Sequence, residues 1–285
     1  MTSLILQGPR LTQEKARQLA SALQGTLRPG AHALRLDIPQ AITREKLTDL
    51  REAADFDINI LPGDFQPDRV RLFITDMDST LINIECVDEI ADFTGLKPQV
   101  AAITESAMRG EIDFETSLQQ RVSLLKGVPA AVLDQVYAQR LRLNPGAETL
   151  LAGLRERGIR TALVSGGFTV FTEKLKARLQ LDYTLANELE IIDGHLSGKV
   201  RGDIVGARAK AAFLTRLCRD LAIEPAQAIA AGDGANDLEM MDIAGLSVAY
   251  HAKPAVQARA DVALNHSGLD AILAFLGQPT PIHTE

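Results

Sequence analysis

Two aspartates, Asp76 and Asp78, stand directly after the apolar run Leu72–Thr75 and are separated by one residue. Such a run is typical of a buried strand in a parallel sheet, where ligands bind beyond the carboxyl ends of the strands. Carboxylate oxygens suit Mg²⁺, and an ionised aspartate beside a metal can attack phosphorus while a second aspartate transfers protons. Alone, such a pair is more often a solvated turn, so other segments must decide.

Three further segments carry residues that suit a bound phosphate. Ser165 can donate its hydroxyl, and Gly166 lets a backbone N–H approach an anion at a helix start. Lys210 offers a point charge. Taken singly, the first segment is also explained by an ordinary strand-to-helix turn, and a lone helical lysine is usually solvated. The third segment is a glycine-rich turn after an apolar run, and it presents three metal-capable side chains, Asp233, Asn236 and Asp237.

Other phosphate-binding and metal-binding motifs are excluded, because the sequence lacks the residues that they require at fixed positions. A calcium loop would need glycine at Leu81 if it began at Asp76, or at Leu238 if it began at Asp233. The Gly232-Asp-Gly234 segment has Asp237 where a dinucleotide-binding fingerprint needs a small residue. No Gly-Lys-Ser or Gly-Lys-Thr occurs, so the nucleotide-binding P-loop is excluded as well.

The elements that must position these residues follow an alternating pattern from residue 69 onward. Helical patterns separate apolar runs at 72–75, 161–164, 228–231, 246–249 and 261–264. This pattern predicts a doubly wound α/β fold with a parallel sheet, over residues 69–285. A stretch at about 85–143 interrupts it with four helical patterns and no strand, and it is predicted to form a cap above the carboxyl edge of the sheet. A hairpin is expected between Leu185 and Val200, turning at Asp193-Gly194.

Residues 1–66 form a separate unit in this interpretation. Short apolar runs alternate there with two helical patterns, which predicts a small α+β domain. A polar, proline-containing joint at 62–67 follows it. No chemical site gathers in this unit, so a regulatory, oligomerising or packing role is expected, and a homodimer is one form it would allow.

Composition limits the possible partners and location. The chain has 285 residues, 46% of them apolar, and a net charge of −7 without a basic cluster, which argues against nucleic acid. No apolar run approaches the roughly 18 residues needed to cross a bilayer, so no membrane partner is expected. The first ten residues lack the pattern of a secretory signal, and we expect a cytoplasmic protein.

Together, the motifs resemble a known family. The segments Asp76-Met-Asp-Ser-Thr80, Ser165-Gly-Gly-Phe168, Lys210 and Gly232-Asp-Gly-Ala-Asn-Asp237 resemble, in order, the four motifs of the haloacid dehalogenase (HAD) superfamily. The similarity is greatest to its phosphoserine phosphatase branch and covers about residues 70–275. Cap residues match that branch too, and the N-terminal unit resembles an ACT-type domain. The resemblance implies a HAD-like, Rossmann-type fold.

The resemblance also implies a mechanism. It makes Asp76 the nucleophile in hydrolysis of O-phospho-L-serine, the last step of serine biosynthesis, through an aspartyl-phosphate. Asp78 would be the general acid and base. Mg²⁺ would be held by Asp76, the Asp78 carbonyl and Asp233. Asp237 would not bind the metal directly but would orient a water molecule or Lys210.

The same resemblance implies that eight residues contact the small-molecule substrate. Glu85 would pair with its α-ammonium group and Arg121 with its α-carboxylate. Met108 and Phe114 would form an apolar wall that excludes water. The phosphate end would meet Ser165, Gly166, Lys210 and Asn236.

Two alternatives remain open on the sequence. The first is a related HAD phosphatase that acts on another small phosphorylated metabolite, or a phosphotransferase that passes the phosphoryl group to an acceptor such as homoserine. The second is a non-catalytic amino-acid sensor with a vestigial α/β domain, which the intact acid pair disfavours.

Overall fold

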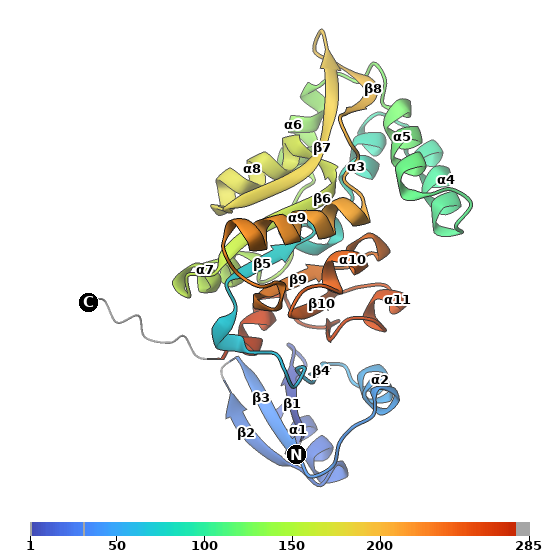
Figure 1. Cartoon of the computed structure of the whole chain (residues 1–285). Coiled ribbons are helices and arrows are strands. Elements are labelled where there is room, and N and C mark those ends of the chain that lie inside the picture. The colour runs from blue at the N-terminus through green and yellow to red at the C-terminus, as the bar shows by residue number, and fades with distance from the viewer. Residues whose placement is uncertain (1, 31, 278–285) are drawn as a thin grey trace.

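The computed structural model describes residues 2–30 and 32–277 (Figure 1). Its N-terminal unit is a four-stranded antiparallel sheet of order β2-β3-β1-β4 with two helices, in the chain order βαββαβ. Leu4, Leu6 and Leu36 are fully buried in its core. The elements are β1 (Thr2–Gln7), α1 (Gln13–Ala22), β2 (Thr26–Gly30), β3 (Ala33–Ile38), α2 (Arg44–Ala53) and β4 (Asp57–Asn59).

Strand β2 was not predicted from the sequence. It lies at the edge of the sheet, paired only with β3, and its residues are exposed or half-buried. An edge strand needs no alternating apolar pattern and tolerates proline, here Pro29. The usual signals of a strand are therefore weak in this segment.

The larger sheet has seven strands in the order β11-β10-β9-β5-β6-β7-β8, all parallel except β8. This confirms the predicted doubly wound α/β fold with a helical cap. The chain leaves β5 towards β6 on one side and returns at β9 on the other, so a switch point lies between β5 and β9. The strands are β5 (Leu72–Thr75), β6 (Arg160–Phe168), β7 (Tyr183–Ile192), β8 (His195–Arg201), β9 (Ala228–Gly232), β10 (Leu246–Tyr250) and β11 (Val262–Leu264).

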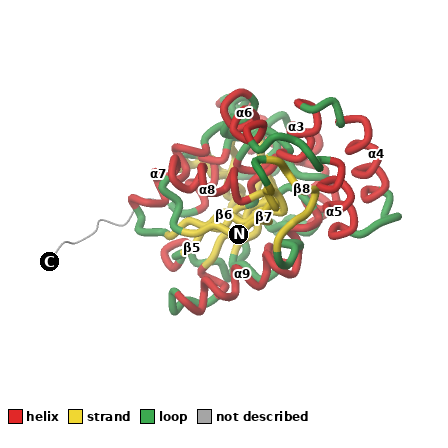
Figure 2. Tube along the Cα trace, turned by 90° about the horizontal axis from the view of Figure 1, so that it is seen from above, coloured by secondary structure: helices red, strands yellow, loops and turns green. Residues whose placement is uncertain are grey.

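Helices cover both faces of this sheet (Figure 2). Phe73 of β5 packs in the same cluster as the apolar residues of α7 and α8. Leu72 and Ile74, which point to the opposite face, pack with those of α9 and α10. The helices are α7 (Ala147–Glu156), α8 (Thr169–Leu179), α9 (Ala207–Asp220), α10 (Leu238–Met241) and α11 (Pro254–Gln257).

The cap lies between β5 and α7 in the chain and above the sheet edge (Figure 1). Its base is closed by the backbone of Asn83, which donates to the Arg142 carbonyl at 3.0 Å. The β7–β8 hairpin turns at Asp193 and Gly194, both at positive φ, as predicted. Its second strand bonds the cap, since Leu196 donates to the carbonyl of Val128 at 2.8 Å. The cap helices are α3 (Cys86–Phe93), α4 (Lys97–Met108), α5 (Phe114–Leu124) and α6 (Ala131–Gln139).

Three buried polar side chains join the N-terminal unit to the end of the larger sheet. Asn59 donates to the Ala263 carbonyl at 2.9 Å and accepts from its amide at 2.8 Å. Asp57 accepts the backbone amides of residues 265, 266 and 267 at 2.7–3.1 Å. Gln7 donates to the carbonyl of Ala271 at 2.8 Å. β4 lies beside β11. At this junction, side chains of the N-terminal unit therefore bond backbone N–H and C=O groups of the larger domain.

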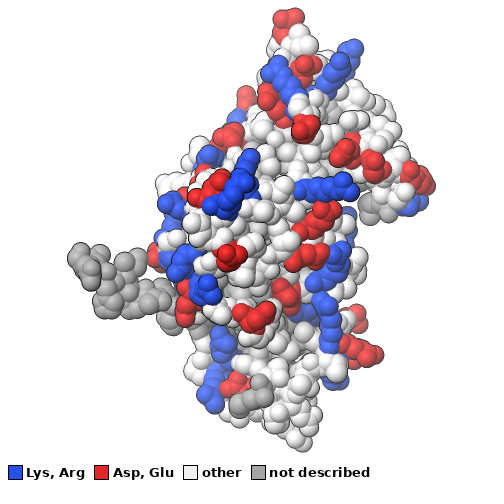
Figure 3. Space-filling view, in the orientation of Figure 1, with Lys and Arg blue, Asp and Glu red and all other residues white. Residues whose placement is uncertain are grey.

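The surface mixes charges of both signs. On the face in Figure 3, lysines and arginines are interspersed with aspartates and glutamates, and neither sign gathers into a large patch. Within the described part of the chain, no helix combines the length and the apolar character needed to span a bilayer.

We predict that Asn59→Ala weakens this junction. The change leaves the N–H and C=O of Ala263 without their partner, at about 1–3 kcal/mol for each buried group left unpaired. Amide exchange of Ala263 should accelerate and the denaturation midpoint should fall. Gln18→Ala, on an exposed position of α1, should change neither. Unaltered exchange at Ala263 would contradict the assignment of Asn59 to the junction.

Candidate active site

The turn after β5 sets the positions of Asp76 and Asp78. Asp76 is 5% exposed and its amide donates to Ala231 of β9 at 2.9 Å, which ties the two strand ends together. Asp78 is extended, and Ser79 follows at φ 56°, a left-handed conformation that is uncommon for a residue with a side chain. The backbone therefore departs from regular geometry at Ser79, three residues after the nucleophile candidate Asp76.

Asn144, just before α7, holds this turn. Its side-chain amide donates to the carbonyls of Thr80 at 2.8 Å, Ile82 at 3.1 Å and Ser79 at 3.4 Å. Its own backbone amide donates to Leu81 at 3.0 Å. One residue thus bonds several carbonyl groups of an irregular segment, most closely those of Thr80, Leu81 and Ile82.

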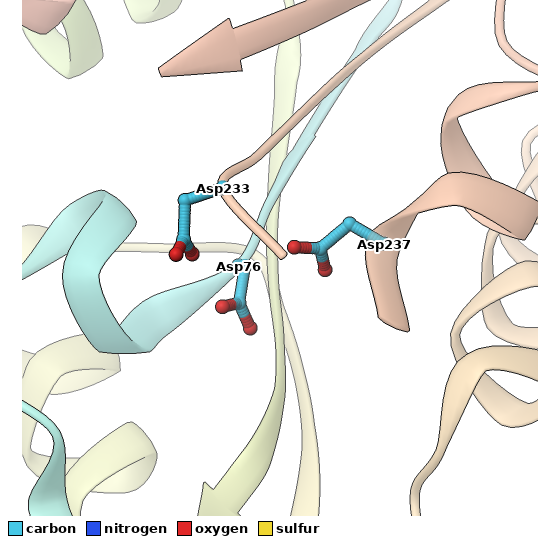
Figure 4. A group of neighbouring side chains, drawn as sticks. All are labelled: Asp76, Asp233 and Asp237. Atoms are coloured by element: carbon cyan, nitrogen blue, oxygen red, sulfur yellow. The ribbon is translucent and has the colours of Figure 1, made fainter. Parts of the chain in front are cut away.

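Three carboxylates meet where β5 and β9 end (Figure 4). Asp76, Asp233 and Asp237 each offer an oxygen within 4.8 Å of the others. The ammonium of Lys210 on α9 is fully buried behind them and donates to Asp76 at 2.6 Å and to Asp237 at 2.7 Å. Thr80 donates to Asp233 at 3.1 Å. Lys210 therefore compensates part of a dense negative charge.

Burial and mutual repulsion govern the ionisation of this cluster. Burial raises the pKa of Asp76 well above its usual value; Lys210 opposes this, while Asp237 and Asp233 add to it. Burial, Asp237 and Glu85 raise the pKa of Asp233 to about 6. Burial alone would lower the pKa of Lys210, but Asp237 and Asp76 outweigh it and raise that pKa. Additional positive charge would favour the ionised carboxylates.

The donor set fits a hard divalent cation. Hydrogen bonds engage one carboxylate oxygen of Asp76 and one of Asp233, which leaves the second oxygen of each for a metal. Asp237 differs, because Lys210 occupies one of its oxygens and the Gly234 amide the other, at 3.1 Å. Asp237 is therefore suited to orienting Lys210 rather than to direct coordination.

The Ser165-Gly166-Gly167 loop lies at the end of β6 in the same cavity. Buried Asn187 of β7 anchors it, donating to the Gly166 carbonyl at 2.8 Å and accepting from the Val205 amide at 2.8 Å. The glycines permit close approach. A Cβ on Gly167 would lie 2.9 Å from the Asp78 carboxylate, and one on Gly166 would lie 2.7 Å from the ring of Phe114. The cap thus packs directly on this loop.

A cavity of about 280 Å³ separates the carboxylates from the cap. Glu85 and Arg121 line its cap side; Glu85 accepts from Ser79 at 2.7 Å, and Arg121 donates to the Ser117 carbonyl at 3.3 Å. Burial raises the pKa of Glu85, although its side chain still reaches solvent. Burial lowers the pKa of Arg121, opposed by Asp88 and Glu85. A negative and a positive group therefore face the cavity together.

The predicted residues that the structure describes fall into two groups in space. Lys210 and Asp237 lie behind Asp76, and the side chain of Met108 lies outside the described residues. The others line one cavity: Asp76, Asp78, Glu85, Phe114, Arg121, Ser165, Gly166, Asp233 and Asn236.

The comparisons with known proteins agree with this fold and site. The family model for haloacid dehalogenase-like hydrolases matches residues 73–242. The chain belongs to this family. It is similar to a phosphoserine phosphatase of Polaromonas sp., with 55% identity over 224 residues that make up 77% of this chain and 95% of the relative.

Solved structures are similar as well. A HAD family hydrolase of Salmonella enterica serovar Typhi superposes with a TM-score of 0.87 at 35% identity, covering 97% of this chain and 99% of that one. A substrate-bound phosphoserine phosphatase complex gives a TM-score of 0.68 at 39% identity and covers 72% of this chain and 98% of that one.

Sequence reasoning missed several residues of the site. Lys253 and Asp88 line the cavity, while Asn144 and Asn187 hold its loops without lining it. All four are single polar residues, and the partners of Asn144 and Asn187 are distant in the chain. Only the position of Asp88 one helical turn after Glu85 gave a local signal, since residues three apart share a helix face.

We predict that Asn144→Ala lowers kcat with little change in KM. Loss of its hydrogen bonds frees the turn that aims Asp76 and Asp78, and about 1.5–3 kcal/mol of lost positioning corresponds to about 10- to 100-fold in rate. Phosphate release from an aryl phosphate gives both constants. Asn83→Ala is the matched control, because exposed Asn83 accepts from the Arg142 amide at the cap base. A wild-type kcat in Asn144→Ala would exclude this role.

Proposed function

We propose that this chain hydrolyses O-phospho-L-serine to L-serine and phosphate, the last step of L-serine biosynthesis, with Mg²⁺ as its cation. One observation carries the proposal. The cavity has the acid pair and the glycine loop at one end and faces Glu85 and Arg121 at the other. A phosphate ester whose other end is a zwitterion matches both ends, and the relative from Polaromonas sp. is a phosphoserine phosphatase.

In this mechanism Asp76 attacks phosphorus in line with the leaving serine oxygen. The bond from phosphorus to that oxygen breaks and an aspartyl-phosphate forms. Lys210 is bonded to the same carboxylate at 2.6 Å and reduces its repulsion from the phosphate. Water then attacks the aspartyl-phosphate, which releases phosphate and restores Asp76.

Asp78 moves the protons in both steps. Burial and the charge of Glu85 raise its pKa to about 8, so the carboxyl group holds a proton at neutral pH that it can donate to the serine oxygen. The resulting carboxylate accepts a proton from the attacking water. Gly167 permits this position, since any larger residue would crowd the carboxylate.

The cation is assigned to Asp76, Asp233 and the main-chain carbonyl of Asp78. When bound there, Mg²⁺ would supply positive charge against the phosphate oxygens and keep both carboxylates ionised. Asp237 would hold Lys210 in place, as its 2.7 Å bond suggests.

The remaining residues select the substrate. Glu85 would bind the α-ammonium group and Arg121 the α-carboxylate, each by a charge-assisted hydrogen bond. Phe114 and Met108 would form the apolar wall that excludes water. The phosphate oxygens would be held by the Ser165 hydroxyl and the Gly166 amide, with Asn236 beside them.

A pair of substrates tests this assignment. Phosphoethanolamine is phosphoserine without its α-carboxylate. Arg121→Gln should lower kcat/KM for phosphoserine about 10- to 100-fold and change it little for phosphoethanolamine, because a hydrogen bond between charged groups contributes about 1.5–3 kcal/mol. Arg109→Gln is the control, since exposed Arg109 pairs with Glu111 in the same cap. The assignment fails if both substrates lose activity equally. The proposed reaction fails if wild-type protein prefers an aryl phosphate to phosphoserine.

A further inference from the structure

A second cavity, of about 490 Å³, lies between the N-terminal unit and the HAD domain. Gln7 and His32 line it from the N-terminal unit, and Pro145, His251, Ser267 and Asp270 line it from the other side. The cavity is larger than the one at the carboxylates and shares no lining residue with it. No part of the mechanism above uses it.

Two buried polar atoms in its walls lack hydrogen-bond partners. They are the side-chain oxygens of Gln7 and Ser267, residues that are 3% and 6% exposed. Most buried polar atoms are paired, so an unpaired one needs an explanation. Asp78 and Asp88, which line the first cavity, carry the same kind of unpaired oxygen. Of the six unpaired buried atoms among the described residues, four therefore line one of the two cavities, and the other two belong to Glu89 and Arg157. In the first cavity a substrate is the proposed partner.

The lining chemistry favours a cationic hydrogen-bond donor. Among the described residues, its lining contains one carboxylate, Asp270, three histidines, His32, His251 and His266, and no lysine or arginine. The Gln7 amide oxygen is an acceptor, and the hydrogen bond that its nitrogen donates to Ala271 fixes the orientation of the amide. A phosphate or other anion would find imidazole groups there, but no lysine or arginine among the described lining residues to pair with. A metal is disfavoured too, since the described residues group metal-capable side chains only at Asp76, Asp233 and Asp237.

We propose that this interdomain cavity binds a small molecule carrying a primary ammonium group. The ammonium group bonds the Asp270 carboxylate and the Gln7 oxygen, and Ser267 takes a further polar group. Pro145 forms part of the wall, and the neighbouring Asn144 holds the catalytic turn. Leu269, beside Asp270, donates to the Pro145 carbonyl at 2.8 Å. The ligand thus contacts the segment that supports Asp76.

Two sources of this chemistry, amino acids and simple amines, can be separated by titration calorimetry. The probes are three amino acids, each paired with the amine that has the same structure but lacks the carboxylate. The pairs are glycine with methylamine, L-alanine with ethylamine, and L-ornithine with putrescine. At least one probe should bind wild-type protein. Equal binding of both members of a pair identifies an amine site, and binding of the amino acid alone identifies a zwitterion site.

Two variants test whether the probes bind in this cavity. Asp270→Asn keeps the shape of an exposed side chain and Gln7→Leu removes the acceptor; each should weaken binding about tenfold or more. Arg121→Gln, in the other cavity, should not affect it. The proposal is overturned if no probe binds, or if Asp270→Asn binds as tightly as wild type. Asp270→Asn alone decides the result if Gln7→Leu does not fold.

Discussion

The ammonium of Lys210, buried between Asp76 and Asp237, is the interaction on which the site depends. It connects the end of β5, the first turn of α9 and the turn after β9, three segments far apart in the chain. Removing one partner from a buried pair of this kind typically costs about 3–5 kcal/mol, because the remaining charge stays buried. Without Lys210, three carboxylates, two of them buried and one half-buried, would meet with only a bound cation beside them to offset their charge.

This arrangement separates the roles of carboxylates that are chemically alike. Asp76 and Asp237 share the lysine, Asp233 bonds a threonine, and Asp78 has an oxygen without a partner. In the proposed mechanism, differences in partner rather than in residue type distinguish the nucleophile, the metal ligand, the supporting carboxylate and the proton carrier. The irregular turn at Ser79 is maintained by Asn144, so that the groups are aimed before substrate binds.

The sequence predicted the sheet, the cap and the segments that meet at its edge because each has a local pattern. Apolar runs such as Leu72–Thr75 bury both faces, and the four motifs each stand at a strand end or helix start. Glu85 and Arg121 had no such pattern and depended on the family resemblance. Asn144 and Asn187, and the junction made by Asp57 and Asn59, were not predicted. Each is a single polar residue bonding backbone atoms of a distant segment, for which the sequence holds no periodic signal.

The central claim is that Asp76 becomes covalently phosphorylated. An aspartyl-phosphate is reduced by borohydride to homoserine, so the reacting residue can be read from peptide masses. Wild-type protein mixed with phosphoserine and Mg²⁺, quenched in acid during turnover and reduced, should carry homoserine at position 76, and protein without substrate should not. Homoserine at position 78 or 233, or none at any position while phosphate is released, would contradict the account.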